Sequence, residues 1–377
     1  MREISGAVRC ALGVGVALVS VAVWSPAPAG AVNEATCASR PVTISGTGGD
    51  DVIQGTSGDD VIAARGGADV IRAGAGKDVV CGGAGDDVVS GGRGSDLVLT
   101  EAGDDIGFGG DGRDGLLGGG GNDRVRGGRG GDFFDSDPGN DSFVGGPGAD
   151  LVAQAAGTRG QSGRDRILTG DGADVVEIAA TDGIVIDAGA DDDTVTITAA
   201  TAAALSLVGG DGIEDQLVLR VTGDSSAVRL DQRAGRLITP TGHQVLTGWE
   251  LASLEGDVRW TYVGTDAEES LLVYGGTLNA DMGAGGDNVY ASGTVGNSYV
   301  DLGPGDIQTA QTGGGDDVLI GGDGIDHLFA GNGDNVLLGG LSTSDWLEAG
   351  DGFDVARDPD GAAICRGLDV VPDNCEN

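Results

Sequence analysis

The sequence predicts an all-β fold, a parallel β-roll or β-solenoid built from nine-residue repeats. From residue 46 to residue 153 the chain repeats every nine residues, twelve times in a row, without an insertion or deletion. The fourth position is glycine and the sixth is aspartate in all twelve units, and the eighth is large and apolar in every unit except that of Gly107. A fixed period of this kind is typical of identical stacked turns that share one continuous core.

The composition is that of an acidic, glycine-rich chain. Its 377 residues include 76 glycines, 60 acidic residues and 21 basic residues, and the formal net charge is −39. Such a composition often favours disorder, but a disordered segment has no reason to keep glycine and aspartate in register. The charge excludes nucleic acid as a natural partner and disfavours anionic membrane surfaces. A compact state must repel itself unless cations neutralise it.

Residues 1–31 have the features of a secretory signal peptide. Arg2 and Arg9 precede an apolar run over 11–24, and the small residues 29–31 offer a cleavage site. The run is too short to span a membrane comfortably, and no later segment approaches transmembrane length. We therefore expect a secreted, extracellular protein without a membrane span.

The cysteines agree with export. Four remain after the signal peptide, an even number compatible with two disulfides in an oxidising compartment. Cys365 and Cys375 are expected to pair with each other, which leaves Cys37 for Cys81. Cys81 stands at position nine of a repeat, which should face outward, so this bond would tether the N-terminal segment to the flank of the stack. Free thiols or a zinc site are the alternatives, and zinc is disfavoured because no histidine or CxxC spacing lies nearby.

Beyond the signal peptide the chain divides into five parts. Residues 32–45 lead into the repeats, with a first strand expected at 42–44. The first array occupies 46–219, where looser units with Asp165, Asp174, Asp193 and Asp215 follow the twelve regular ones. The nonapeptide period is lost over 220–280, returns in a second array at 281–357 with Asn335 once in place of the acid, and ends before a polar tail, 358–377, closed by the second disulfide.

The segment without the period is still expected to be β. Alternation and β-branched or aromatic content predict ordinary strands. These strands are expected at 228–230, 236–238, 259–263 and 271–274.

Each unit has a glycine-rich half and an apolar half. Glycine at positions one, two and four allows positive φ and hence a tight reversal. The next three residues, such as Val52-Ile53-Gln54, should form a short strand whose central side chain points inward. Two units, or 18 residues, would complete one turn with a strand in each of two sheets. Aspartates 18 residues apart therefore stack in two columns, one headed by Asp51 and the other by Asp60.

Stacked carboxylates call for a hard dication. Adjacent strands lie about 4.8 Å apart, so the carboxylates should repel one another and raise each other's pKa. Calcium accepts six to eight oxygens at roughly 2.3–2.6 Å with loose geometry, and the carbonyls of the glycine loop can complete its shell. Magnesium is stricter, and transition metals would want imidazole or thiolate, although the only histidines are His243 and His327.

Multiple calcium ions are therefore expected. Six turns on each edge leave five gaps, which makes about ten sites in the regular array. The candidate carboxylate ligands are Asp51, Asp60, Asp69, Asp78, Asp87, Asp96, Asp105, Asp114, Asp123, Asp132, Asp141, Asp150, Asp165, Asp174, Asp317, Asp326, Asp345 and Asp354. The candidate carbonyl ligands belong to Gly49, Gly58, Gly67, Gly76, Gly85, Gly94, Gly103, Gly112, Gly121, Gly130, Gly139 and Gly148.

The units resemble the G-G-x-G-x-D-x-U-x repeat of RTX (hemolysin-type) calcium-binding proteins, as in Gly82-Gly83-Ala84-Gly85-Asp86-Asp87-Val88-Val89-Ser90. The resemblance implies a parallel β-roll in which calcium bridges neighbouring turns through position-six aspartates and loop carbonyls. It is highly specific over 46–153, moderate over 160–219 and 282–357, and absent from 220–280. Proteins of this family are usually exported by a C-terminal signal. This chain instead has an N-terminal signal peptide, and its C-terminal end carries cysteines. The chain is therefore more similar to secreted actinobacterial RTX proteins without an attached catalytic domain.

Position seven should face outward, yet it is apolar in nine of the twelve units. One interpretation is β-propensity on a half-exposed strand. The other is a hydrophobic stripe that docks residues 220–280 or another molecule. On one sheet the stripe would comprise Val61, Val79, Leu97, Gly115, Phe133 and Leu151.

Catalysis finds little support. Neither HExxH nor G-x-S-x-G occurs, and paired acids such as Asp86-Asp87 are better explained as calcium-loop residues. In segment 220–280 a glycan-active or glycan-binding face is conceivable around Trp249 and Trp260, but we favour these tryptophans as the core of a small β insertion. The acids that would serve such a face are Glu250, Glu255, Glu268 and Glu269.

We therefore expect a non-enzymatic calcium-binding scaffold protein that folds on binding extracellular calcium. The first alternative is a calcium-dependent adhesin or an extracellular matrix or glycan-binding protein. A carbohydrate-active enzyme is less favoured. The sequence does not identify a protein or polysaccharide partner.

Overall fold

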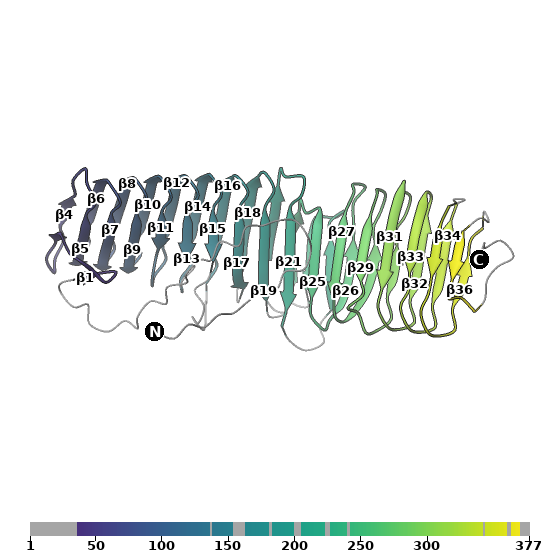
Figure 1. Ribbon diagram of the computed structural model, residues 1–377. Coiled ribbons are helices and arrows are strands. Elements are labelled where there is room, and N and C mark those ends of the chain that lie inside the picture. The colour runs from purple at the N-terminus through teal and green to yellow at the C-terminus, as the bar shows by residue number, and fades with distance from the viewer. Residues whose placement is uncertain are drawn as a thin grey trace.

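The protein is a long solenoid of short strands (Figure 1). The computed structural model describes residues 36–135, 138–153, 163–180, 183–199, 205–222, 227–239, 242–341, 344–359 and 363–369. Within these ranges there are 37 strands and no helix. The described residues therefore contain no helix that could cross a membrane. The predicted all-β class is confirmed. The predicted signal peptide, residues 1–31, lies outside the described residues.

Two sheets run along the molecule, and each takes one strand from every turn except one, where sheet II takes three. We call them sheet I, with 17 strands, and sheet II, with 18. Sheet I contains β3 (Ile44–Ser45), β5 (Val61–Gly66), β7 (Val79–Ala84), β9 (Leu97–Ala102), β11 (Gly115–Leu117), β13 (Phe133–Asp135), β15 (Leu151–Ala153), β17 (Val175–Ala180), β19 (Thr194–Ala199), β21 (Gln216–Val221), β25 (Leu251–Glu255), β27 (Ser270–Tyr274), β29 (Asn288–Ala291), β31 (Ile307–Thr312), β33 (Ile325–Phe329), β35 (Trp346–Glu348) and β37 (Ile364–Arg366). Sheet II contains β4 (Val52–Gln54), β6 (Val70–Ala75), β8 (Val88–Arg93), β10 (Ile106–Asp111), β12 (Arg124–Arg129), β14 (Ser142–Pro147), β16 (Arg166–Asp171), β18 (Ile184–Ala190), β20 (Leu205–Gly210), β24 (Gly242–Thr247), β23 (Arg236–Thr239), β22 (Ala227–Asp231), β26 (Arg259–Val263), β28 (Thr277–Asp281), β30 (Tyr299–Asp301), β32 (Val318–Gly322), β34 (Val336–Gly340) and β36 (Val355–Arg357).

The turn is 18 residues long in the regular array. Ile62 of β5 lies opposite Val80 of β7, and Ile71 of β6 lies opposite Val89 of β8, all in parallel pairs. Most strands there have six residues instead of the expected three, because positions one to three of the next unit continue the ladder. The first strand of the solenoid sheets, β3, begins at Ile44 and not at the expected residue 42.

The position-eight side chains line the interior. Ile62, Val89 and Phe143 are fully buried, and one hydrophobic core extends from Ile53 to Cys365. Phe134 and Phe143 stack across the interior with ring centroids 4.8 Å apart. One apolar residue per unit is therefore enough to build a continuous core once the turns are stacked.

Segment 220–280 continues both sheets. β21 pairs directly with β25, and β25 with β27, in sheet I. In sheet II the antiparallel strands β24, β23 and β22 lie between β20 and β26, so this sheet gains two extra strands. The four strands predicted from the sequence fall within β22, β23, β26 and β27.

The tryptophans of this segment lie in the core of the solenoid. Trp249, Trp260 and Tyr262 are buried within the same core as the arrays. The prediction that the tryptophans are core residues is confirmed, but their core belongs to the solenoid and not to a separate insertion.

A disulfide fastens the N-terminal hairpin to sheet I. The hairpin consists of β1 (Thr36–Cys37) and β2 (Arg40–Pro41). The predicted bond between Cys37 and Cys81 is present, with Cα atoms 5.9 Å apart. Cys37, Val79 and Cys81 form a second small hydrophobic cluster outside the main core. The start of the position-seven stripe is therefore covered by the chain's own N-terminal segment and not by residues 220–280.

At the other end of the chain, Cys365 is buried and held in a disulfide. Its predicted partner, Cys375, lies outside the described residues.

Candidate metal centre

The glycine loops connect the two sheets at both edges of the solenoid. Position two and position four carry the positive φ angles, as in Gly83 (117°) and Gly85 (121°). The expectation that position one also needs positive φ is wrong: Gly82 does not have it, and Ala64 stands at the same position of its unit. A Cβ atom at Gly82 would lie 2.5 Å from Oδ2 of Asp87, so a small residue there leaves room for the carboxylate.

The position-six aspartates form two ladders. In each, the backbone N–H of one aspartate donates to Oδ1 of the aspartate in the next turn, for example from Asp69 to Asp87 at 2.8 Å and from Asp87 to Asp105 at 2.7 Å. The first column contains Asp51, Asp69, Asp87, Asp105, Asp123, Asp141 and Asp165. The second column contains Asp60, Asp78, Asp96, Asp114, Asp132, Asp150, Asp174, Asp193 and Asp215. The aspartates 18 residues apart thus stack as the repeat predicts.

The second array continues both columns. Asp326 donates its N–H to Oδ1 of Asp345 in the second column. In the first column, Asp317 donates to Asn335 and Asn335 to Asp354. The predicted ligands of both arrays therefore stand in column positions.

The second carboxylate oxygen is the notable feature of these columns. It is buried and has no hydrogen-bond donor within the described part of the chain, although a buried oxygen without a partner is costly. This holds for Oδ2 of Asp69, Asp78, Asp87, Asp96, Asp105, Asp114, Asp123, Asp132, Asp150, Asp174, Asp193, Asp215, Asp287, Asp317, Asp326 and Asp354. The columns therefore present negative oxygens in places that call for a cation or a proton.

The pKa values of these buried carboxyl groups are raised. Burial, and secondly the neighbouring carboxylates of the column, raise the pKa of Asp87 to about 6 and those of Asp105 and Asp150 to about 7. Hydrogen bonds from the backbone oppose the shift. Mutual repulsion was expected to raise these pKa values, and the direction is correct, but desolvation is the larger cause.

Asn335 shows what the columns accept in place of the second oxygen. Its Nδ2 donates to the carbonyl oxygens of Gly331 and Gly333, both at 3.0 Å, and to Oδ1 of Asp354 at 2.8 Å. An amide N–H₂ group is a pure donor, so these three oxygens converge on a partially positive group. In an aspartate unit the same place calls for a positive charge.

The donor set fits calcium. It consists only of oxygens, from carboxylates and backbone carbonyls, which suits a hard cation with a flexible shell. No group of three or more His, Cys, Asp or Glu side chains that could hold a metal occurs among the described residues, so each candidate site depends on carbonyls as well. The sequence singled out position-four carbonyls, such as that of Gly85. The carbonyl of position two, which Gly331 contributes, was missed, although the glycine repeated there was a signal for it.

Two of the acids considered for catalysis also stand in the second column. Asp215 donates its N–H to Oε2 of Glu250 at 3.0 Å, and Glu269 donates its own N–H to Oδ1 of Asp287 at 2.9 Å. Glu255 forms an ion pair with Arg220 at 2.7 Å. Glu250 and Glu269 were not recognised as column residues, because glutamate replaces aspartate and the period is lost around them.

Comparison with known families gives one result for this chain. A model of the RTX calcium-binding nonapeptide repeat, in four copies, matches residues 45–80, 82–116, 117–152, 159–177 and 311–343. A search of curated proteins finds no match.

Proposed function

Because this chain carries RTX calcium-binding nonapeptide repeats in a parallel β-roll, we propose that it is a secreted scaffold protein whose arrays fold on binding extracellular calcium. The observation that carries the proposal is the pair of columns of buried carboxylate oxygens without donors. Position-six aspartates and loop carbonyls, from 46–219 and 281–357, are the proposed ligands. Bound calcium would supply the positive charge that these oxygens lack.

Folding and calcium binding are coupled in this proposal. A site made from two successive turns does not exist in the unfolded chain, so binding free energy becomes folding free energy. Extracellular calcium modules bind at roughly 10⁻⁴–10⁻³ M per site. Each turn contacts only its neighbours, so the sites of one column should fill cooperatively. In a calcium-poor cytoplasm the chain, with its net charge of −39, would stay expanded.

Two features support an extracellular location. The disulfide between Cys37 and Cys81 is of a kind that persists in oxidising compartments. Residues 1–31 have the composition of a cleaved signal peptide.

A non-enzymatic role is part of the proposal. Glu250 and Glu269 bond to column residues, and Glu255 pairs with Arg220. Trp249 and Trp260 are buried in the core. Of the residues first considered for carbohydrate chemistry, all except the exposed Glu268 are thus engaged in structural contacts.

The test is a calcium titration of the full chain without residues 1–31. Circular dichroism should show mainly coil in EGTA and strand above a sharp calcium threshold, and calorimetry should count several ions with a cooperative isotherm. Magnesium at the same concentration should fail to fold the arrays. A spectrum with full strand content in EGTA, unchanged by calcium, would refute the proposal.

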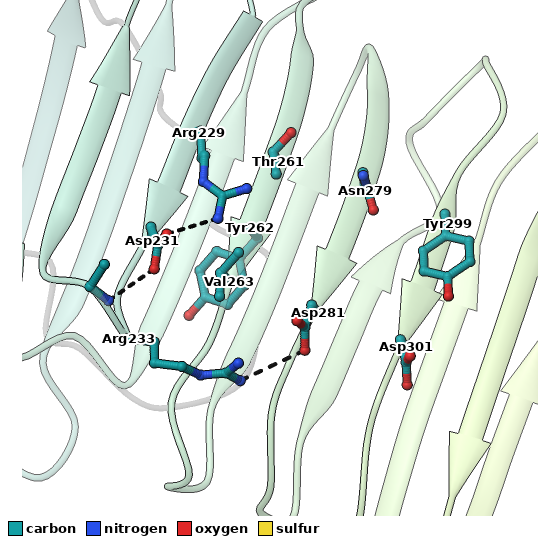
Figure 2. A pocket seen from close by; sticks show the side chains of 11 residues that line it. Arg229, Asp231, Arg233, Thr261, Tyr262, Val263, Asn279, Asp281, Tyr299 and Asp301 are labelled. Atoms are coloured by element: carbon teal, nitrogen blue, oxygen red, sulfur yellow. Dashed lines mark hydrogen bonds and ion pairs between the residues drawn. The ribbon is translucent and has the colours of Figure 1, made fainter. Parts of the chain in front are cut away.

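A second candidate function, glycan binding by an adhesin or matrix protein, is favoured by one groove. It has a volume of about 590 Å³ and lies on the outer face of sheet II, across β22, β26, β28 and β30 (Figure 2). Tyr299 is 41% exposed there, beside Asn279 and Asp301. Arg233 lies 3.7 Å from Asp281. An exposed ring flanked by amide, carboxylate and guanidinium groups suits the faces and hydroxyls of a sugar.

Substitution at this groove tests the second candidate. Tyr299→Ala should abolish retention of the calcium-loaded protein on an insoluble polysaccharide such as cellulose or chitin. Tyr274→Ala is the matched control, because Tyr274 is 48% exposed on sheet I, outside this groove. Equal retention of both variants, or no retention of the parent chain, would exclude this function for the groove.

A further inference from the structure

The columns are not uniform along the solenoid, and the differences lie in the donors around each position-six side chain. We propose that calcium binds in two separate blocks, residues 60–215 and 310–357, on either side of a middle region, residues 227–282, that folds without calcium. The calcium sites of the first block extend to Asp193 and Asp215, which lie outside the matched repeats. Asn335 lies inside a matched repeat but is not a calcium ligand in this proposal. This inference rests on the calcium-dependent folding proposed above.

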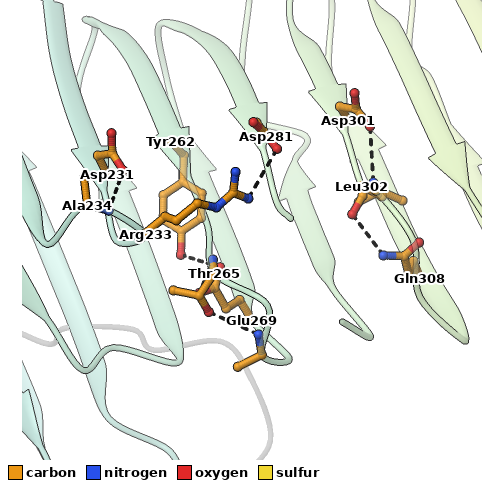
Figure 3. A network of polar contacts seen from close by, with 12 residues as sticks. Asp231, Arg233, Ala234, Tyr262, Thr265, Glu269, Asp281, Asp301, Leu302 and Gln308 are labelled. Carbon is orange, nitrogen blue, oxygen red and sulfur yellow. Dashed lines mark hydrogen bonds and ion pairs between the residues drawn. The ribbon is translucent and has the colours of Figure 1, made fainter. Parts of the chain in front are cut away.

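At Glu269 the protein itself supplies every donor. Oε1 accepts hydrogen bonds from the N–H of Thr265 at 2.9 Å and from its hydroxyl at 2.7 Å. Oε2 accepts the hydroxyl of Tyr262 at 3.2 Å (Figure 3). The carboxylate of Glu269 therefore needs no cation.

The donors to Glu269 belong to a buried network. Nε2 of Gln232 donates to the hydroxyl of Tyr262 at 2.6 Å and to the carbonyl oxygen of Trp249 at 2.7 Å. Gln232, Tyr262 and Glu269 are all buried. A satisfied network of this kind fixes the positions of its members without a ligand.

In the first column apolar residues replace the acids after Asp165, first at the end of the first block and then in the middle region. Val185 donates its N–H to the carbonyl of Asp165, which places Ile184 at position six of its turn, and Leu205 lies opposite Ile184. Thr277 donates its N–H to the carbonyl of Val258, and this equivalent bond places Val258 at position six of its turn. Ile184, Leu205 and Val258 are 2–3% exposed and belong to the hydrophobic core.

The carboxylates of the middle region therefore need no cation. Within its described residues no carboxylate oxygen is buried without a hydrogen bond, whereas Asp215 before it and Asp287 after it each have one. It also holds Trp249, Trp260 and Tyr262, three of the largest buried side chains. Burial of apolar surface favours folding at any calcium concentration.

Side-chain amides occupy ion positions at two further turns. Nε2 of Gln308 donates to the carbonyls of Gly285 and Leu302, both at 3.0 Å. Nδ2 of Asn335 donates to two loop carbonyls and to Asp354. At these two turns the amide, and not calcium, satisfies the loop oxygens.

Hydrogen exchange followed by mass spectrometry tests the blocks on the full chain without residues 1–31. In EGTA, peptides from 227–282 should be protected and peptides from 60–215 and 310–357 should exchange freely. Millimolar calcium should protect both blocks and leave 227–282 unchanged. Free exchange of 227–282 in EGTA with protection on adding calcium would overturn the inference alone. No protection of any block by calcium would overturn the proposed function.

Tryptophan emission gives an independent measurement. In a Trp346→Phe variant, Trp249 and Trp260 are the only reporters once residues 1–31 are removed. Their emission should be that of buried indoles in EGTA and should not shift with calcium. The matched variant Trp249→Phe/Trp260→Phe leaves Trp346 in the second block, and its emission should shift with calcium. A calcium-dependent shift in the first variant would contradict the inference.

The inference that a side-chain amide takes the place of a calcium ion at Asn335 is tested by restoring the acid. Asn335→Asp removes the amide and should raise the number of ions counted by calorimetry by one. Asn332→Asp is the control, because it adds the same charge at an exposed position of the same loop, and it should leave the number unchanged. An unchanged number for Asn335→Asp, or an equal rise for both variants, would overturn this inference.

Discussion

The regular array, residues 46–153, and the middle region, residues 227–282, share two sheets and one core but satisfy their loop oxygens differently. Asp87 and Asp105 each keep a buried oxygen without a donor, whereas Glu269 receives donors from Thr265 and Tyr262. The shared sheets show that parallel pairing and inward apolar residues are enough to define a turn. The position-six environment decides instead under which conditions the turn is stable.

The largest expected effect is the loss of the middle region's core. Trp260→Ala should cost about 3–5 kcal/mol, as large-to-small core substitutions do, because Trp260 is fully buried in the core. Urea denaturation in EGTA, followed by Trp249 emission in the Trp346→Phe background, should lose its transition. Phe143→Ala in the array should leave that transition unchanged and weaken only the calcium-loaded form. Equal effects of both variants in EGTA would remove the distinction between the regions.

The next effect concerns ligands within the array. Asp87→Ala and Asp105→Ala should raise the calcium midpoint on the order of tenfold, or about 1.4 kcal/mol, and lower the Hill slope. Each has acids on both sides of its column. Asp165→Ala should do less, since Ile184 follows it in the column. A calcium titration by circular dichroism measures both quantities, and a larger effect at Asp165 would contradict the assignment of the block's end.

Acid should replace calcium in part in the arrays. The pKa of Asp87 rises to about 6 and those of Asp105 and Asp150 to about 7, from an ordinary value of 3.8. A raised carboxyl pKa favours the folded state below the ordinary value, and this stability is lost as pH rises through the folded-state pKa. Calcium-free protein should therefore gain strand signal in circular dichroism between pH 7.5 and 5. More strand at pH 7.5 than at pH 5 would show that the sign is wrong.

The smallest effect is expected near the start of the second column, where a threonine donates hydrogen bonds to the aspartate. The N–H and hydroxyl of Thr56 donate to Oδ2 of Asp60 at 2.7 and 2.9 Å. Thr56→Val removes the hydroxyl donor and should cost about 1 kcal/mol in thermal denaturation at saturating calcium. Ser45→Ala, at an exposed residue of β3, is the control and should have no effect. A loss well above 1 kcal/mol, or an equal loss for Ser45→Ala, would contradict this assignment.

The regular array could be predicted almost completely from the sequence. Strict periodicity places residues such as Ile62 inside and Asp87 in a column without any knowledge of distant contacts. The middle could not, because the step between column residues grows from 18 to 22 between Asp193 and Asp215 and to 35 between Asp215 and Glu250. The pairing of β21 with β25 and the hydrogen bond from Asp215 to Glu250 show in the structure that the ladder continues across that step. The donors to Glu269 are close in sequence, since Thr265 lies four and Tyr262 seven residues before it. Only Gln232, 30 residues from Tyr262, joins this network from a distant part of the chain.

The disulfide between Cys37 and Cys81 has a consequence for the numbering of turns. A repeat with identical units has no intrinsic origin, because a slip by one whole turn exchanges each strand for an equivalent one. The bond joins the N-terminal hairpin, whose sequence occurs once, to one particular strand of sheet I. The disulfide thereby fixes which turn is the first. The position of every later aspartate along the stack follows from it.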